Sequence, residues 1–196
     1  MTTRILLAGI LGGIAMFIWS AIAHMFTPLG EAGVRELPNE SAVMAALESN
    51  LGQNRGLYLY PGPGAGPNAT RAQKEEAMKK MGEKTANNPS GILMYTPRRP
   101  LNMARLLGIE FATELLESIL VVALLAQTRI TTFGGRVLFV TVAGILAAIA
   151  TNVSYWNWYG FPKRYIASYM FMQVVGFFCA GLVAALLLRN KSTTPS

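Results

Sequence analysis

The sequence has little charge, no aspartate, one cysteine and one histidine. Charged residues make up 14% of its 196 residues, against roughly 25% in a typical soluble domain. Cys179 has no second cysteine with which to form an intrachain disulfide, and we expect it to pack as a small apolar side chain. The single histidine, His24, excludes haem sites with two histidines and metal sites with several within this chain.

Sequence signatures of several enzyme classes are also missing. The chain contains no glycine-rich nucleotide-binding loop, no HExxH zinc-protease motif and no CxxC pair. Because aspartate is absent, any carboxylate chemistry would depend on glutamate. We therefore favour a non-catalytic protein, and the sequence does not identify a cofactor.

Long apolar runs account for the low charge. Each is close to the roughly 20 residues that a helix needs to cross about 30 Å of hydrocarbon, and backbone groups in lipid must be hydrogen-bonded within the helix. The runs are residues 5–26, 103–126, 137–153 and 165–188. We predict a mainly α fold, a polytopic membrane protein with four transmembrane helices. The first run also resembles a signal peptide, with Ala21-Ile22-Ala23 as a cleavage site, but its length and bulky Trp19 favour an uncleaved anchor.

The excess of basic residues indicates how the chain is oriented in the membrane and does not indicate nucleic-acid binding. The net charge is +7, but nine of the seventeen basic residues lie between residues 27 and 102 among seven glutamates, so no single basic face forms. With the N-terminus inside, the inner segments hold five basic residues and the short outer loop two. These are Arg4, Arg129, Arg136, Arg189 and Lys191 inside, and Lys163 and Arg164 outside. The balance favours both termini inside, although Arg98, Arg99 and Arg105 would lie outside.

The segment 27–102 is predicted to be a small α+β extracytoplasmic loop domain. Helices are expected at 40–49, capped by Asn39, and at 70–84, with the ion pairs Glu75–Lys79 and Glu76–Lys80. Segments 56–61 and 91–97 are extended candidates that we expect to pair as strands. The predicted organisation is thus a first transmembrane helix (1–26), this domain, three further transmembrane helices (103–188) and a cytoplasmic tail (189–196).

Two stretches carry a resemblance to known proteins. GEAGVRELPNE, residues 30–40, and SYWNWYGFP, residues 154–162, with four spans around them, resemble a group of bacterial inner-membrane proteins whose function is not assigned. The resemblance covers most of the chain. It implies a bacterial inner (plasma) membrane setting, and it implies no activity, cofactor or catalytic residue.

Three glutamates interrupt the second apolar run and form the strongest functional signal. Glu110, Glu114 and Glu117 have the spacing i, i+4, i+7, which places them in one stripe of a helix. If this span ends near residue 126, Glu117 lies near mid-membrane and Glu110 near the outer edge. An ionised carboxylate in mid-membrane costs about 2.5–3.5 kcal/mol. We therefore expect the stripe to face the bundle interior, a water-filled cavity or a partner subunit.

No lysine or arginine lies deep in any run to neutralise the stripe. Arg105 and the pair Lys163–Arg164 lie at the outer boundary, within reach of Glu110 alone. We expect Glu114 or Glu117 to be protonated at neutral pH, because burial and like-charge repulsion favour the neutral acid. A bound cation, a cationic substrate or a basic residue of another chain would be the alternative counter-charge.

Other polar residues fall at similar depth and suggest a pocket that opens outward. They are His24 and Ser20 in the first run, Asn152 at the end of the third and Gln173 in the fourth. Three interpretations stay open: hydrogen bonds between helices, a ligand or cation site, and proton-coupled chemistry. A metal held by His24 with two glutamates is less favoured than an interfacial histidine without a ligand role, so we predict no metal site.

Aromatic residues between the third and fourth runs predict a membrane interface. Trp156, Trp158, Tyr159 and Tyr165 are expected in this belt, and the turn at 160–162 leaves room for a quinone, lipid or peptide. Two functions follow from the sequence. The first is an accessory or ligand-binding membrane subunit with a membrane-protein partner or a second copy of itself. The alternative is a small proton- or cation-coupled transporter or membrane enzyme that uses Glu114 and Glu117.

Overall fold

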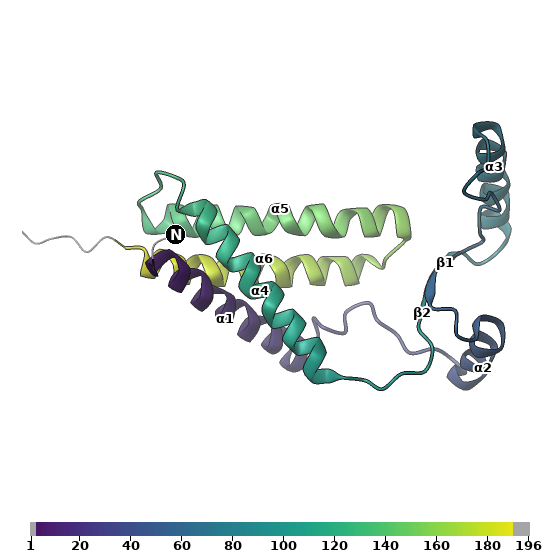
Figure 1. The fold of residues 1–196 in the computed structure, drawn as a ribbon, viewed down its shortest axis with the longest axis horizontal. Helices are drawn as coiled ribbons and strands as arrows, with labels where there is room; N and C mark the ends of the chain where they lie inside the picture. Colours follow the sequence, from purple (N-terminus) through teal and green to yellow (C-terminus); the bar gives the residue numbers. More distant parts are fainter. Residues whose placement is uncertain (1–2, 190–196) are drawn as a thin grey trace, which may run out of the picture. The chain divides into compact units, whose positions relative to one another are not determined.

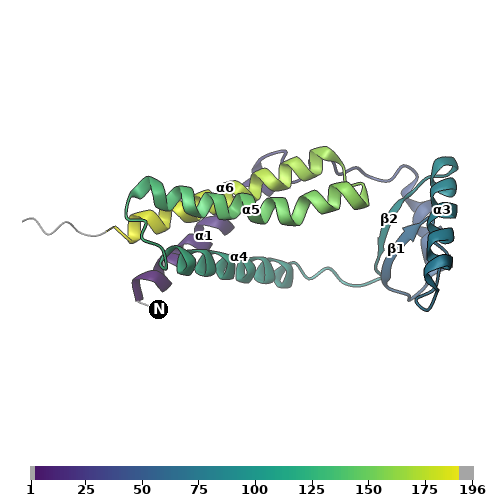
Figure 2. The same cartoon turned by 90° about the horizontal axis from the view of Figure 1, so that it is seen from above.

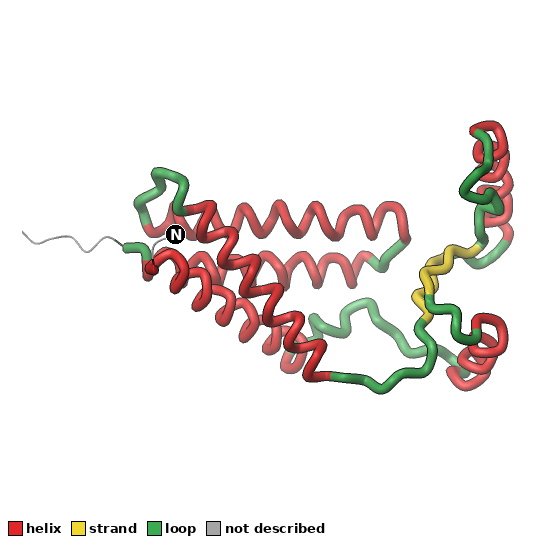
Figure 3. Tube along the Cα trace, viewed as in Figure 1, coloured by secondary structure: helices red, strands yellow, loops and turns green. Residues whose placement is uncertain are grey.

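The computed structural model describes residues 3–189, which form six helices and one two-stranded sheet (Figures 1 and 3). The elements are α1 (Thr3–Phe26), α2 (Glu40–Leu51), β1 (Gly56–Tyr60), α3 (Arg71–Asn87), β2 (Gly91–Tyr95), α4 (Met103–Leu125), α5 (Phe133–Tyr159) and α6 (Lys163–Leu187). The predicted mainly helical architecture with a small sheet is confirmed. Lys191, and the predicted tail from residue 190 on, lie outside the described residues.

The chain divides into two compact units. One is a helical bundle made of the residues up to 35 and from 102 onward, and the other is Glu36–Leu101. Residues 27–35, which we had placed in the loop domain, pack with the bundle: the Ser168 hydroxyl of α6 donates a hydrogen bond to the Leu29 carbonyl at 2.7 Å. Gly33, at a φ of +81°, lies so close to Tyr165 that a Cβ would come within 2.8 Å of its backbone nitrogen.

Three helices of the bundle, α1, α5 and α6, are long and apolar enough to cross a membrane. α4 has 23 residues, but Arg105 and the three glutamates lie along it. That α4 also spans the membrane stays a prediction.

The third apolar helix extends further than the sequence suggested. α5 begins at Phe133, where the Thr132 side chain accepts a hydrogen bond from the Gly135 N–H at 3.2 Å, and ends at Tyr159. Only Gly160, at a φ of +69°, ends it. Asn152 is therefore an interior residue of α5 and does not close it. The apolar run 137–153 is shorter than α5 because the aromatic residues after Val153 are less hydrophobic than those before it. They are equally able to continue a helix.

Helix packing leaves the bundle open on one side. α1 packs against α4 and α6, and α6 packs against α5, while α4 makes few contacts with α5 or α6. Figures 1 and 2 show the N-terminus, the α4–α5 loop and the end of α6 together at one end of the bundle, which we call the Arg4 end. The opposite end, where α1 ends and α4 begins, is the His24 end.

Glycines set the close approach of α1 to α4. A Cβ on Gly9 would lie 2.8 Å from the Ile119 Cα, and one on Gly13 would lie 2.7 Å from the Leu115 Cα. The spacing of four residues puts both glycines on one face of α1, where they let two backbones meet. At the Arg4 end a hydrophobic core follows: Ala8, Met16, Val121, Val122, Leu125, Val140, Phe177, Ala180 and Ala184.

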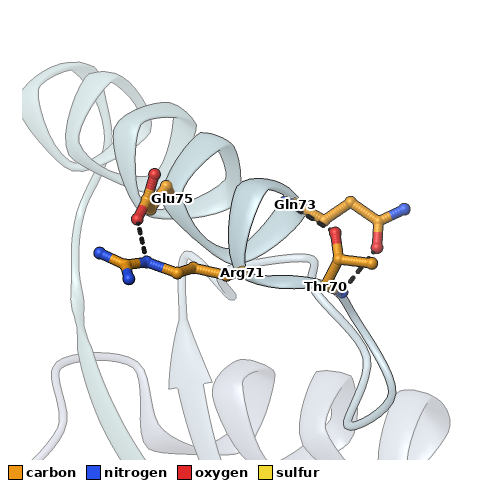
Figure 4. A network of polar contacts seen from close by, with 4 residues as sticks. All are labelled: Thr70, Arg71, Gln73 and Glu75. Carbon is orange, nitrogen blue, oxygen red and sulfur yellow. Dashed lines mark hydrogen bonds and ion pairs between the residues drawn. The ribbon is translucent and has the colours of Figure 1, made fainter.

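The unit 36–101 contains the predicted hairpin partners. β1 and β2 pair antiparallel, with Gly56 opposite Tyr95 and Tyr60 opposite Gly91. α3 starts with a capping box between Thr70 and Gln73 (Figure 4). No residue from 36 to 101 is buried, so caps, strand pairing and ion pairs hold this unit.

The side-chain interactions expected at the two helices of this unit are found in part. Lys80 pairs with Glu76 at 2.7 Å, and their hydrogen bond and opposite charges lower the pKa of Glu76 and raise that of Lys80. Glu75 pairs with Arg71 at 2.8 Å (Figure 4) and not with Lys79, although both basic residues lie four positions from it on the same face. Asn39 precedes α2 in a left-handed conformation, and its side chain makes no cap hydrogen bond.

Candidate functional site

A cavity of about 250 Å³ lies between the four helices of the bundle. Every helix of the bundle contributes to its wall. The lining residues are Met16, Trp19, Ser20 and His24 of α1, Glu110, Thr113, Glu114 and Glu117 of α4, Thr151 and Asn152 of α5, and Tyr169, Met172, Gln173 and Gly176 of α6. The structure thus brings together the six residues that the sequence singled out: Glu110, Glu114, Glu117, His24, Asn152 and Gln173. Their role in binding stays a prediction.

The three glutamates line the α4 side of this cavity at different exposures. Glu110 is exposed, Glu117 is partly buried, and Glu114 is 8% exposed. The Oε2 atom of Glu114 is buried and has no hydrogen-bond partner among the described residues. A buried carboxyl oxygen without a partner loses its hydration and gains nothing in return. Glu114 therefore presents unused hydrogen-bonding and charge-pairing capacity.

No basic side chain of the described residues forms an ion pair with any of the three glutamates, and no lysine or arginine among them lines the cavity. Ser20 of α1 lies beside the Glu114 carboxyl. The site is therefore acidic and uncompensated within residues 3–189.

Opposite the glutamates, amides link α5 and α6. The Asn152 amide nitrogen donates to the Ala148 carbonyl at 3.0 Å and to the Gln173 Oε1 at 3.3 Å. Asn152 is 7% exposed, so these bonds fix its orientation. The Gln173 amide nitrogen makes no hydrogen bond to the described residues and is free to contribute to the cavity.

Two aromatic residues, Trp19 and Tyr169, form another part of the cavity wall. Trp19 donates its indole N–H to the Met172 carbonyl at 2.9 Å, which holds the ring against α6. Tyr169 lies with its ring edge-on to His24, at a centroid distance of 6.0 Å, and stacks on Tyr165 at 4.4 Å. Electron-rich ring faces and carboxylates in one cavity are the elements that attract a cation.

Metal binding is a weaker interpretation of the same residues. Among residues 3–189, no three side chains of histidine, cysteine or glutamate are arranged to hold a metal ion. His24 Nδ1 lies 3.0 Å from the Ser20 carbonyl of its own helix, and this contact directs one ring nitrogen to the backbone.

Sequence reasoning missed several lining residues. Thr113 belongs to the same stripe as the glutamates, since it follows Glu110 by three residues. Tyr169 precedes Gln173 by four residues and shares its face. On α1, Met16 precedes Trp19 by three residues and Ser20 by four. The helical spacing can be read from the sequence in each case. It does not identify these residues as lining a cavity, because apolar and aromatic residues on such faces are common in any packed helix.

The four predicted interface aromatics separate into two groups. Trp156 and Trp158 are exposed, at 44% and 78%, on the last turns of α5. Tyr159 and Tyr165 belong to a chain of rings that runs through Tyr155 and Phe161 with centroid separations of 5.3 to 5.9 Å. Through Tyr169 this chain reaches the cavity.

Comparisons of the chain with protein-family models, with curated proteins and with solved structures found no match.

Proposed function

We propose that this chain is a four-span integral membrane protein that binds a small organic cation in the glutamate-lined cavity. It acts as an accessory or ligand-binding subunit and not as an enzyme. The observation that carries the proposal is the buried, unpartnered carboxyl oxygen of Glu114 in a cavity that no lysine or arginine of the described residues lines.

The faces of α4 support its role as the fourth span. Its glutamates line the cavity, so they need not face lipid. Its exposed residues elsewhere are largely apolar and include Leu106, Leu107, Leu116, Leu120 and Leu124, each about half exposed or more. A helix with its charges turned inward and leucines outward suits a bilayer.

The cavity chemistry favours an ammonium-type ligand. Carboxylates supply the charge, the Trp19 and Tyr169 rings supply cation–π surface, and the Ser20 and Thr113 hydroxyls supply hydrogen-bond acceptors. A volume of about 250 Å³ lies below the roughly 300–1,000 Å³ of sites for drug-sized ligands. The ligand should accordingly be small, on the scale of a simple alkylammonium ion.

The hydrophobic core at the Arg4 end favours binding over passage. Beyond the buried Ser118, α4 continues with the buried residues Val121, Val122 and Leu125, which share one hydrophobic core with Val140 and Ala184. An ion would have to cross this apolar layer. A proton- or cation-coupled carrier is the second candidate, because the carboxylates lie at successive turns of α4, from exposed Glu110 to partly buried Glu117.

Titration of the purified protein with tetramethylammonium tests the binding proposal. We expect saturable heat of binding in neutral detergent, and none with tert-butanol, a neutral molecule of similar size. Equal binding of both would show that charge is not recognised. Ammonium-dependent flux in liposomes that disappears in Glu117→Gln would instead establish the carrier.

The wider setting follows from the charge distribution and the resemblance to bacterial inner-membrane proteins. Both termini lie in the cytoplasm, and the unit 36–101 lies outside the cytoplasmic membrane. An accessory subunit should co-purify in gentle detergent with a stoichiometric membrane-protein partner or as a homo-oligomer. Purification of the protein as a monomer without a partner would contradict the accessory role. Ligand binding would still be decided by the titration.

A further inference from the structure

A second cavity, of about 290 Å³, lies at the Arg4 end of the bundle. The start of α1, the α4–α5 loop, the first turn of α5 and the end of α6 surround it. Figures 1 and 2 show these segments together at this end. Three arginines, Arg4, Arg129 and Arg136, line it.

Arg136 is the buried member of the three. It is 7% exposed, and its Nε donates to the Ile130 carbonyl at 3.2 Å. Its Nη1 is buried and has no hydrogen-bond partner among the described residues. Because a guanidinium remains charged at any physiological pH, a buried one without an anion is costly.

The described residues supply no carboxylate to this cavity. None of its lining residues is acidic. From Met1 to Gly30 and from Ser118 to Ser196 the sequence contains no glutamate or aspartate. The N-terminus of α5, which begins at Phe133 beside the cavity, adds a partial positive charge of the same sign. An anion is the counter-charge that this arrangement lacks among the described residues.

The remaining wall combines hydroxyl and apolar groups. Thr128 and Thr131 line the cavity together with Ile5 and Leu188. A phosphate group would meet the guanidinium forks, which bind phosphate oxygens in pairs. The apolar residues would meet the carbon atoms next to that phosphate. Basic pockets between membrane helices bind lipid headgroups in this way.

We propose that the three arginines form a binding site for a phosphate group, supplied by an anionic phospholipid or by a soluble phosphate. The site is separate from the glutamate-lined cavity and does not depend on the function proposed for that cavity.

Thermal melts of the full chain in neutral detergent test the site. The probes are dioctanoyl phosphatidic acid, dioctanoylglycerol with the same acyl chains but no phosphate, and inorganic phosphate. We expect saturable stabilisation by the phosphatidic acid and none by dioctanoylglycerol. In Arg129→Gln the half-saturating concentration should rise about tenfold, as loss of one charge-assisted contact predicts. Arg136→Gln should abolish the shift, and Arg129→Gln keeps the test valid if that variant does not fold.

Arg164→Gln is the matched control, because it removes an exposed arginine from the His24 end. It should bind like the unmodified protein. Stabilisation by inorganic phosphate with the same dependence on Arg129 would support the site and identify a soluble phosphate as its ligand. Absence of saturable stabilisation by either phosphate probe, or equal weakening in Arg164→Gln, would overturn the proposal.

Discussion

The indole nitrogen of Trp19 on α1 donates a hydrogen bond to the main-chain carbonyl of Met172 on α6, at 2.9 Å and across 153 positions of sequence. Both residues line the glutamate cavity. The bond fixes the separation of two of its walls. Gly176, one turn after Met172, lies beside the indole: a Cβ there would be at an ordinary van der Waals distance, 3.7 Å, from its ring. The cavity is thus maintained by a contact that involves no glutamate.

Replacement of Trp19 by phenylalanine should weaken the bundle. The variant keeps a ring but leaves the Met172 carbonyl without this donor, at a cost of about 1 kcal/mol. We expect a lower melting midpoint in detergent. Trp158→Phe is the control, because Trp158 is 78% exposed. An unchanged midpoint in Trp19→Phe would mean that this bond does not hold α1 to α6.

Gly13→Ala should separate α1 from α4. The added Cβ would lie 2.7 Å from the Leu115 Cα, and because backbone cannot yield as a side chain does, we expect a loss of roughly 1–3 kcal/mol. Gly108→Ala on α4, where a Cβ meets nothing within 4 Å, should be neutral or slightly stabilising. Melting midpoints check both, and a Gly13→Ala variant as stable as Gly108→Ala would argue against this helix contact.

Membrane orientation is testable by cysteine labelling in a Cys179→Ala background. Ala72 in α3 and Gln127 in the α4–α5 loop are both exposed. If the unit 36–101 is extracytoplasmic, a membrane-impermeant thiol reagent should modify intact cells of Ala72→Cys and not of Gln127→Cys. Both should react after lysis. Labelling of Gln127→Cys alone would reverse the proposed orientation, and labelling of both in intact cells would exclude a membrane between them.

The hydrophobic runs predicted the helices of the bundle because length and apolar composition alone decide that property. The hairpin between Gly56–Tyr60 and Gly91–Tyr95 was equally readable, since both segments are short, rich in β-formers and followed by proline. The glutamate spacing placed three carboxylates on one face. That face lines a cavity in the structure.

The rest depended on tertiary packing. Nothing in the sequence shows that Trp19 donates a hydrogen bond to Met172. Nor does it show that α4 makes few contacts with α5 and so leaves a cavity. Both follow from how α1 packs between its neighbours. From the sequence, Arg136 contributes only to the number of basic residues that predicts the membrane orientation of the chain. Its burial beside Ile130 follows from the path of the α4–α5 loop, which periodicity does not predict.

Glu114→Leu tests whether the stripe faces protein. In a protein-lined cavity, leucine would leave the neighbouring polar groups facing an apolar side chain, at a cost of about 1–3 kcal/mol. On a lipid-facing surface, the same change would remove an insertion cost and stabilise the protein by a comparable amount. We expect a lower melting midpoint than that of the unmodified protein. A higher one would show that no polar group of the cavity depends on the Glu114 carboxyl, and would contradict this expectation.

The most direct test of cation binding is the effect of tetramethylammonium on the melting of Glu114→Gln. Glutamine preserves the size and hydrogen bonding of a protonated glutamate but carries no charge, so without ligand the variant should melt close to the unmodified protein. With saturating tetramethylammonium, the unmodified protein and the control Glu83→Gln, altered at an exposed position of α3, should both be stabilised. Glu114→Gln should not. If Glu114→Gln gains the same stabilisation as the unmodified protein, the buried carboxyl does not hold the cation and the proposed function is wrong.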